Sequence, residues 1–98
     1  MMNVISIRLY ILAAVKSGVN TSTSIGKTVE RLRSDTKIGI GDVAGALFNL
    51  TQEELLIAEP SGTRANGKVY RLTTKGSDYL AQQVTHLTKL IAYIEGEN

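Results

Sequence analysis

Hydrophobic residues recur with the spacing of a helix in four stretches of the chain and with that of a strand in two. The first predicted helix covers about residues 4 to 17 and is apolar on nearly every side. Asn3 is suited to cap its start, and Gly18 follows its last turn. Because so little of this helix is polar, we expect neighbouring elements to cover most of it.

Two further helices follow. One is predicted from about 23 to 34, after a loop rich in Ser, Thr and Asn, with apolar residues at i, i+4 and i+7. The next runs from about 40 to 53, and Val43, Leu47 and Leu50 form its apolar side. At 100° per residue, the opposite side carries small and polar residues together with one aromatic ring: Gly41, Gly45, Phe48, Asn49 and Gln52.

Residues 55–59 and 68–73 have the short apolar pattern of strands. The segment between them is rich in turn residues and contains Asn66-Gly67, a strong hairpin signal. A strict two-residue turn there would leave the start of the first strand unpaired, so we expect a wider loop or a bulge. The hairpin is predicted to pack on the helices through three side chains, Ile57, Tyr70 and Leu72.

The last predicted helix starts at Thr73 or Thr74 and continues to about residue 94. Its apolar residues form a heptad-like seam with spacings of 4, 3, 4 and 3: Leu80, Val84, Leu87, Ile91 and Ile94. The seam either pairs with the same seam of a second copy or folds back on the first helix. Pairing is favoured, because a domain this small has little spare surface with which to bury a long apolar helix.

Composition restricts the class of protein. The 98 residues are 43% hydrophobic and 20% charged, as expected for one soluble globular domain. No apolar run approaches the roughly 20 residues of a membrane helix, and the start lacks the pattern of a signal peptide. There is no cysteine and one histidine, which fits a reducing compartment and excludes disulfides and a His-rich metal site. We therefore expect a cytoplasmic protein without membrane association.

Candidate catalytic motifs fail on their context. Gly26-Lys27-Thr28 resembles the end of a P-loop, but Thr21 stands where that motif requires glycine. His86 lies within a predicted helix and no nucleophile is implied beside it. Glu53 and Glu54 are adjacent on a helix, so their side chains point about 100° apart. We predict that the chain is not an enzyme and has no cofactor or bound metal.

The net charge of +2 divides into blocks of opposite sign. Residues 1–41 carry a net +4, residues 42–59 a net −4, residues 60–75 a net +4 and residues 76–98 a net −2. The acidic block covers the third predicted helix and the strand after it, whereas the second basic block covers the hairpin. Any partner must be compatible with both.

The order helix, helix, helix, strand, loop, strand, helix resembles the winged helix-turn-helix family of bacterial, archaeal and phage transcription regulators. The resemblance covers about residues 5–80 and rests on Val43-Ala44-Gly45-Ala46-Leu47-Phe48-Asn49-Leu50, on Leu55-Leu56-Ile57 and on Tyr70-Arg71-Leu72-Thr73-Thr74-Lys75-Gly76. The last stretch matches the family pattern Tyr-x-Leu-Thr-x-x-Gly at the end of the wing. The long final helix is similar to those that pair subunits in PadR- and MarR-type regulators.

The resemblance implies a mainly α fold with a small β-hairpin (α+β). Residues 1–75 would form the winged helix-turn-helix domain, and residues 76–98 a dimerisation helix packed on it. The implied function is that of a transcriptional regulator, such as a repressor, that binds double-stranded DNA sequence-specifically as a homodimer. Its third helix would enter the major groove, and its basic wing would contact the backbone or minor groove.

The implied site residues follow from that arrangement. The implied DNA contacts are Arg31, Arg33, Lys37, Ala44, Gly45, Phe48, Asn49, Gln52, Arg64, Asn66 and Lys68. The implied dimer interface is Leu80, Val84, Leu87, Ile91 and Ile94. Arg31, Arg33 and Lys37 can equally be solvated charges at a helix end, whereas DNA contact is favoured over an ordinary charged hairpin tip for Arg64 and Lys68. Phe48 is either tucked between helices or exposed to a partner.

The third helix departs from the family pattern in its charge. It contains no Lys or Arg, and its only base-reading amides are Asn49 and Gln52. Glu54 stands where the family prefers glycine. The alternative is therefore a winged-helix protein–protein interaction module, such as an adaptor, an antirepressor or a phage-type inhibitor. It would contact a protein through Phe48 and the acidic third helix, without strong DNA binding.

Overall fold

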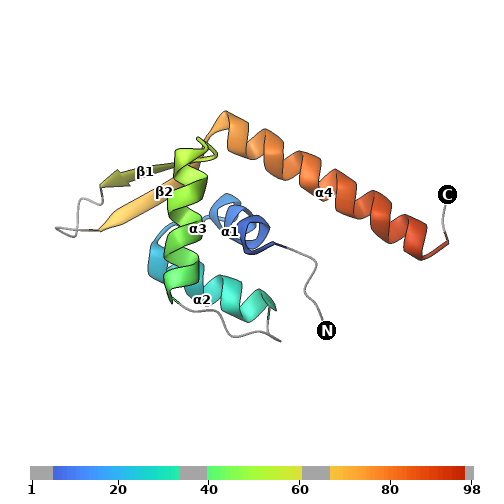
Figure 1. Cartoon of the computed structure of the whole chain (residues 1–98), viewed down its shortest axis with the longest axis horizontal. Helices are drawn as coiled ribbons and strands as arrows, with labels where there is room; N and C mark the ends of the chain where they lie inside the picture. Colours follow the sequence, from blue (N-terminus) through green and yellow to red (C-terminus); the bar gives the residue numbers. More distant parts are fainter. Residues whose placement is uncertain (1–5, 34–39, 61–66, 97–98) are drawn as a thin grey trace.

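The computed structural model describes residues 6–33, 40–60 and 67–96. The elements occur in the predicted order: α1 (Ile7–Lys16), α2 (Ser22–Arg33), α3 (Ile40–Gln52), β1 (Leu56–Pro60), β2 (Lys68–Leu72) and α4 (Thr74–Ile94). The first three helices and the β1–β2 hairpin form one body, from which α4 extends to the far end of the molecule (Figure 1). The mainly α fold with a two-stranded hairpin is thus confirmed.

α1 is shorter than predicted at its start. It begins at Ile7, and Ser6 is its N-cap, whose hydroxyl accepts a hydrogen bond of 3.1 Å from the backbone N–H of Arg8. Asn3, the cap expected from the sequence, lies outside the described residues. The predicted end is confirmed, since Gly18 follows the helix with φ +102°, a left-handed conformation that favours glycine.

α2 begins slightly earlier than predicted, inside the stretch expected to be a loop. The hydroxyl of Thr21 accepts a hydrogen bond of 3.2 Å from the backbone N–H of Ser24, so a loop-forming residue serves as a helix cap. Apolar side chains of all four helices and β1 meet in one core: Ile11, Leu12, Val15, Ile25, Val29, Val43, Ala46, Leu47, Leu50, Leu55, Leu56 and Leu80.

β1 and β2 pair antiparallel, with Leu56 opposite Leu72. Residues 61–67 connect them, so the expectation of a loop wider than two residues is confirmed. The prediction that Ile57 packs on the helices was wrong. Ile57 pairs with Arg71 and is 43% exposed, whereas Leu56 is 1% exposed. Successive side chains of a strand point to opposite faces, so an offset of one residue moves Ile57 outward.

The start of α4 is hydrogen-bonded to and closely packed on the segment that connects α3 and β1. The Thr73 hydroxyl accepts a hydrogen bond of 2.8 Å from the N–H of Gly76 and donates one of 2.6 Å to the carbonyl of Glu54. A Cβ on Gly76 would lie 2.0 Å from the carbonyl oxygen of Leu55. Only glycine fits there, which explains the last position of the Thr-x-x-Gly pattern.

The first turns of α4 pack on the body of this chain. Gly76 and Leu80 are the buried residues of α4, and Leu80 belongs to the core. This corrects the assignment of Leu80 to a dimer interface, because it is already covered within one copy. The predicted division at residue 75 falls inside the first turn of α4. Beyond Leu80 the helix is largely exposed, and none of the described helices is long and apolar enough to cross a membrane.

Candidate nucleic-acid interface

α3 has one buried and one exposed side. Val43, Ala46, Leu47 and Leu50 are buried in the core. Seven residues on the other side are exposed: Gly41, Asp42, Ala44, Gly45, Phe48, Asn49 and Gln52. The helix lies at the surface of the body beside the β1–β2 hairpin (Figure 1). We call Gly41, Ala44, Gly45, Phe48, Asn49 and Gln52 the outer face of α3.

The two glycines of the outer face are not required by packing within the chain. A Cβ at Gly41 or at Gly45 would meet no atom within 4 Å. Neither glycine has a positive φ. A glycine inside a helix costs about 1 kcal/mol relative to alanine, so Gly45, in the interior of α3, lowers the stability without an internal compensation. The first turns of α3 therefore offer bare backbone to whatever approaches them.

Phe48 is exposed rather than tucked between helices. Its side chain is 63% exposed, which rules out one of the two interpretations of the sequence. Asn49 is its neighbour and Gln52 lies one turn later, and both are exposed. The outer face thus presents an aromatic ring and two amides, with no cationic side chain.

The acidic block is partly neutralised within the chain. The guanidinium of Arg8 donates hydrogen bonds of 2.5 and 2.7 Å to the two carboxylate oxygens of Glu53. This bonding lowers the pKa of Glu53, with smaller contributions from the charges of Arg8 and Lys75. In the hairpin, Arg71 bonds both oxygens of Glu59 at 2.8 and 2.9 Å and likewise lowers the pKa of that carboxyl. Glu53 and Glu59 are therefore both paired with an arginine within the chain.

Contacts with the acidic block also engage two cations of the second basic block, residues 60–75. Arg71 is engaged with Glu59, and the Lys75 ammonium donates a hydrogen bond of 3.1 Å to the backbone carbonyl of Glu53. Lys68 is exposed at the start of β2, on the hairpin. Arg64 and Asn66, the other predicted wing contacts, lie outside the described residues.

The basic residues at the end of α2 separate into two kinds. Arg31 is exposed. Arg33 is half-buried, and its guanidinium carbon lies 5.9 Å from the centre of the Tyr10 ring, within cation–π range. Its Nε is buried and has no hydrogen-bond partner among the described residues. Arg33 therefore packs against α1, which does not fit its predicted role as an outward DNA contact. Lys37 lies outside the described residues.

The predicted dimer seam beyond Leu80 lies open along α4. Val84 is 51%, Ile91 54% and Ile94 71% exposed, and Leu87 is half-buried. Leu90 and Tyr93 are exposed on the same helix. An apolar row of this length exposed to water calls for a partner.

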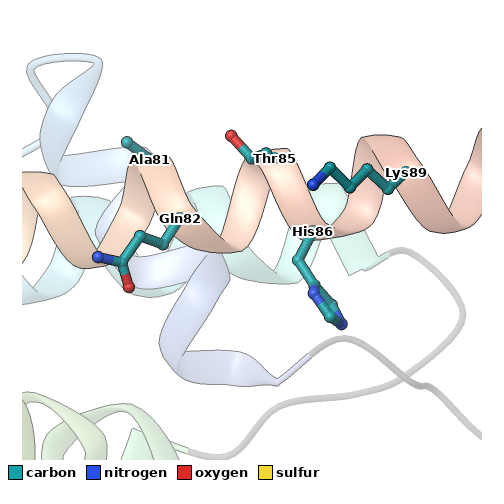
Figure 2. A pocket seen from close by; sticks show the side chains of 5 residues that line it. All are labelled: Ala81, Gln82, Thr85, His86 and Lys89. Atoms are coloured by element: carbon teal, nitrogen blue, oxygen red, sulfur yellow. The ribbon is translucent and has the colours of Figure 1, made fainter.

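The surface hollows do not resemble enclosed ligand sites. One hollow of about 370 Å³ is lined by residues of α4 alone, namely Ala81, Gln82, Thr85, His86 and Lys89 (Figure 2). A second, of about 380 Å³, lies between the end of α1 and β2. Within the described residues, no three His, Cys, Asp or Glu side chains are grouped so that they could hold a metal ion.

The ion pair of Arg8 with Glu53 was not foreseen from the sequence. The two residues are 45 positions apart, and nothing in the local pattern of either one signals the contact. The pair of Glu59 with Arg71 carried a weak signal, because opposite charges stand on two strands predicted to pair.

The fold is that of MarR-family transcription regulators. The PcaV transcriptional regulator from Streptomyces coelicolor, in complex with its natural ligand, matches with a TM-score of 0.78 at 14% identity, over 92% of this chain and 60% of PcaV. The zinc-responsive MarR family member ZitR from Lactococcus lactis matches with a TM-score of 0.70 at 22% identity, over 96% of this chain and 61% of ZitR. BpsR from Bordetella bronchiseptica, whose DNA binding is regulated by 6-hydroxynicotinic acid, matches with a TM-score of 0.72 at 14% identity, over 92% of this chain and 64% of BpsR.

This chain thus spans about three-fifths of the length of these regulators. No protein-family model and no curated protein matches its sequence. At these identities the likeness shows the winged helix-turn-helix fold, in which β1 and β2 form the wing.

Proposed function

We propose that this protein is a sequence-specific, double-stranded DNA-binding transcriptional regulator that acts as a homodimer. The outer face of α3 carries the proposal. It is a continuous exposed side of a helix in the recognition position, with glycines where side chains would hold a partner away. The fold shared with PcaV, a transcriptional regulator, and with BpsR, which binds DNA, supports the same function.

In this proposal α3 enters the major groove, whose width admits one helix. Arg31 and Lys37 reach the phosphates beside it, because most protein–DNA hydrogen bonds go to the backbone. In the wing, Arg64 and Lys68 contact phosphates and Asn66 contacts the minor groove. Arg33, held on Tyr10, adds positive potential rather than a direct contact.

Two copies pair through the exposed part of α4. The interface consists of four seam residues, Val84, Leu87, Ile91 and Ile94. Their spacing of 3 or 4 residues is that of a helix packed on another helix. A two-fold dimer places its two recognition helices on successive turns of one face of the duplex, about 34 Å apart. Because the target is DNA, we also place the protein in the cytoplasm.

The exposed Phe48 is also the observation on which the alternative, a protein-interaction module, depends. The second support for that alternative was the acidic block, and it is weakened because Glu53 and Glu59 are paired within the chain. Two measurements separate the two functions: retardation of a DNA duplex at low salt, and retention of a protein partner by the variant Phe48→Ala. A protein-interaction module would retard no duplex even at low salt, and it would lose its partner in the variant Phe48→Ala.

The test of DNA binding is a titration of the full chain with labelled duplexes over a series of salt concentrations, read by fluorescence anisotropy. Log affinity should fall steeply with log salt. The double variant Arg64→Ala/Lys68→Ala should bind every sequence more weakly and reduce the salt slope by about 2. Lys89→Ala, which removes one exposed lysine on α4 away from the wing, is the control for loss of a surface charge and should leave the affinity close to that of the wild type. Affinity of the double variant equal to that of the wild type at low salt would contradict the proposed role of the wing.

A further inference from the structure

The outer face of α3 limits which base pairs the proposed regulator can read. In the major groove, Arg and Lys read guanine, Asn and Gln read adenine, apolar groups contact the thymine methyl, and Asp and Glu accept from cytosine. α3 contains no Arg or Lys between Ile40 and Gln52. The side chains that do project from it therefore favour one class of base pair.

Two amides of the outer face are suited to adenine. Asn49 and Gln52 are both exposed and lie three residues apart, so they project from the same side of the helix. Their separation along the helix axis is about 4.5 Å, close to the step of about 3.4 Å between stacked base pairs. The two amides can thus address neighbouring base pairs.

Phe48 provides the matching contact for thymine. Its ring is 63% exposed and lies one turn before Gln52 on the same side of α3. The C5-methyl of thymine is the apolar group of the major groove, and an exposed apolar ring on α3 is suited to contact it. The methyl of Ala44, one turn earlier, is exposed as well.

Gly45 lets the backbone of α3 come close enough for the outer-face side chains to reach the bases. It lies one turn before Asn49, and a Cβ there would occupy open space. With no side chain at this position, the α3 backbone can approach the floor of the groove more closely than it could with a larger residue.

The cations near the end of α3 are not available to read guanine. Arg8 is bound to the carboxylate of Glu53, and Lys75 to its backbone carbonyl. Asp42, the acidic residue of α3, lies in the first turn and has an interaction of its own. No group of the outer face thus favours a G·C pair.

We propose that α3 reads A·T base pairs in the major groove, with the Asn49 and Gln52 amides on adenine and the Phe48 ring on the C5-methyl of thymine. This inference rests on the proposed DNA-binding function and adds the class of target sequence. A protein that read DNA through a guanine-binding arginine would have the same fold and a different operator.

The experiment selects bound duplexes from a random pool with the full chain and then measures affinity for the selected site with modified bases. We expect A·T pairs at the positions that α3 covers. Replacing thymine there by deoxyuridine removes only the C5-methyl and should weaken wild-type binding about fivefold. Replacing adenine by 7-deazaadenine removes only N7 and should weaken binding about tenfold.

Each modification is matched to one variant. Phe48→Ala should bind thymine and deoxyuridine duplexes equally, and Asn49→Ala should lose its response to 7-deazaadenine at one position. Leu32→Ala, an exposed leucine on α2, is the control for Phe48→Ala and should retain the full response to deoxyuridine. The altered side chains are exposed, so thermal unfolding should show that each variant is folded.

The possible results are distinct. Selection of G·C pairs under α3, or a response to deoxyuridine that is the same in the wild type and in Phe48→Ala, would overturn this inference while DNA binding stands. Absence of binding to any duplex at low salt would overturn the proposed function itself. An A·T preference that both modified bases leave unchanged would assign the reading to the minor groove and also overturn the inference.

Discussion

The guanidinium of Arg8, in the first turn of α1, holds both carboxylate oxygens of Glu53, the residue that follows α3. The same residue accepts a hydrogen bond from Lys75 of α4 through its backbone carbonyl. Glu53 therefore joins the end of the proposed recognition helix to the first helix and to the start of the proposed dimer helix. In the charge count Glu53 is unfavourable for DNA binding, but in the fold its charge is paired with that of Arg8.

The first prediction concerns acid stability. Hydrogen bonds from Arg8 and from Arg71 hold the pKa values of Glu53 and Glu59 below their ordinary value of about 4.5. A carboxyl whose folded pKa is lowered contributes stability above its unfolded pKa and loses it as the pH falls through the folded value. The Tm should therefore decrease below about pH 4.5.

The double variant Glu53→Gln/Glu59→Gln should have a lower Tm than the wild type at pH 7 and a smaller decrease in Tm between pH 5 and pH 3. Thermal unfolding followed by circular dichroism measures both. Glu95→Gln, near the exposed end of α4, is the control for the loss of a carboxyl away from both ion pairs. Parallel profiles for the wild type and the double variant would show that these pairs do not contribute.

The second prediction concerns Glu54, whose φ of +65° lies in the left-handed region. This conformation is unfavourable for a residue with a Cβ and costs nothing extra for glycine. Glu54→Gly should therefore raise the stability by about 0.5–1 kcal/mol, even though glycine elsewhere usually lowers it. Glu54→Ala keeps the Cβ and removes the charge. An equal gain in Glu54→Ala, measured by urea unfolding, would assign the effect to charge.

The third prediction compares two glycines that differ in their surroundings. Gly76→Ala places a Cβ against the carbonyl of Leu55 and should destabilise the chain by about 2–4 kcal/mol. Gly45→Ala places a Cβ in open space within a helix and should stabilise it by about 1 kcal/mol. If α3 enters DNA closely at this position, the more stable Gly45→Ala variant should bind its duplex more weakly. Tighter binding by Gly45→Ala would contradict close approach of the backbone.

The fourth prediction separates the two ends of the α4 seam. Leu80→Ala removes a core side chain and should lower the stability of each chain by about 2–4 kcal/mol. Ile91→Lys replaces an exposed residue, so it should leave the fold intact and convert a dimer into a monomer. Light scattering coupled to size-exclusion chromatography gives the mass. A wild type that is monomeric at all concentrations would contradict pairing through α4.

Much of the fold was predictable because the signals are local. The spacing of apolar residues sets the type of each element, and this order was confirmed. The exposed side of α3 also followed from the sequence, since 100° per residue places Gly45, Asn49 and Gln52 opposite Leu47 and Leu50. The need for a loop wider than two residues followed from counting positions between the strands.

Other features depended on a choice between two nearby residues or two environments, and the sequence does not show which one is adopted. Ser6 rather than Asn3 caps the described α1, and Ile57 faces outward because it pairs with Arg71, so that Leu56 and not Ile57 shares the face of Tyr70 and Leu72. Phe48 had two allowed environments, and only the packing of α3 on the body decided that it is exposed.

The sequence by itself thus determined the elements, their order and the chemistry available on the outer face of α3. Only the tertiary structure decided which charges face a partner. Arg8 and Glu53 are 45 residues apart, too far for the local spacing of residues to relate them. Their contact exists because α1 and the end of α3 meet in the folded chain. An ion pair depends on positions in space, whereas charge counted along the chain records only positions in sequence.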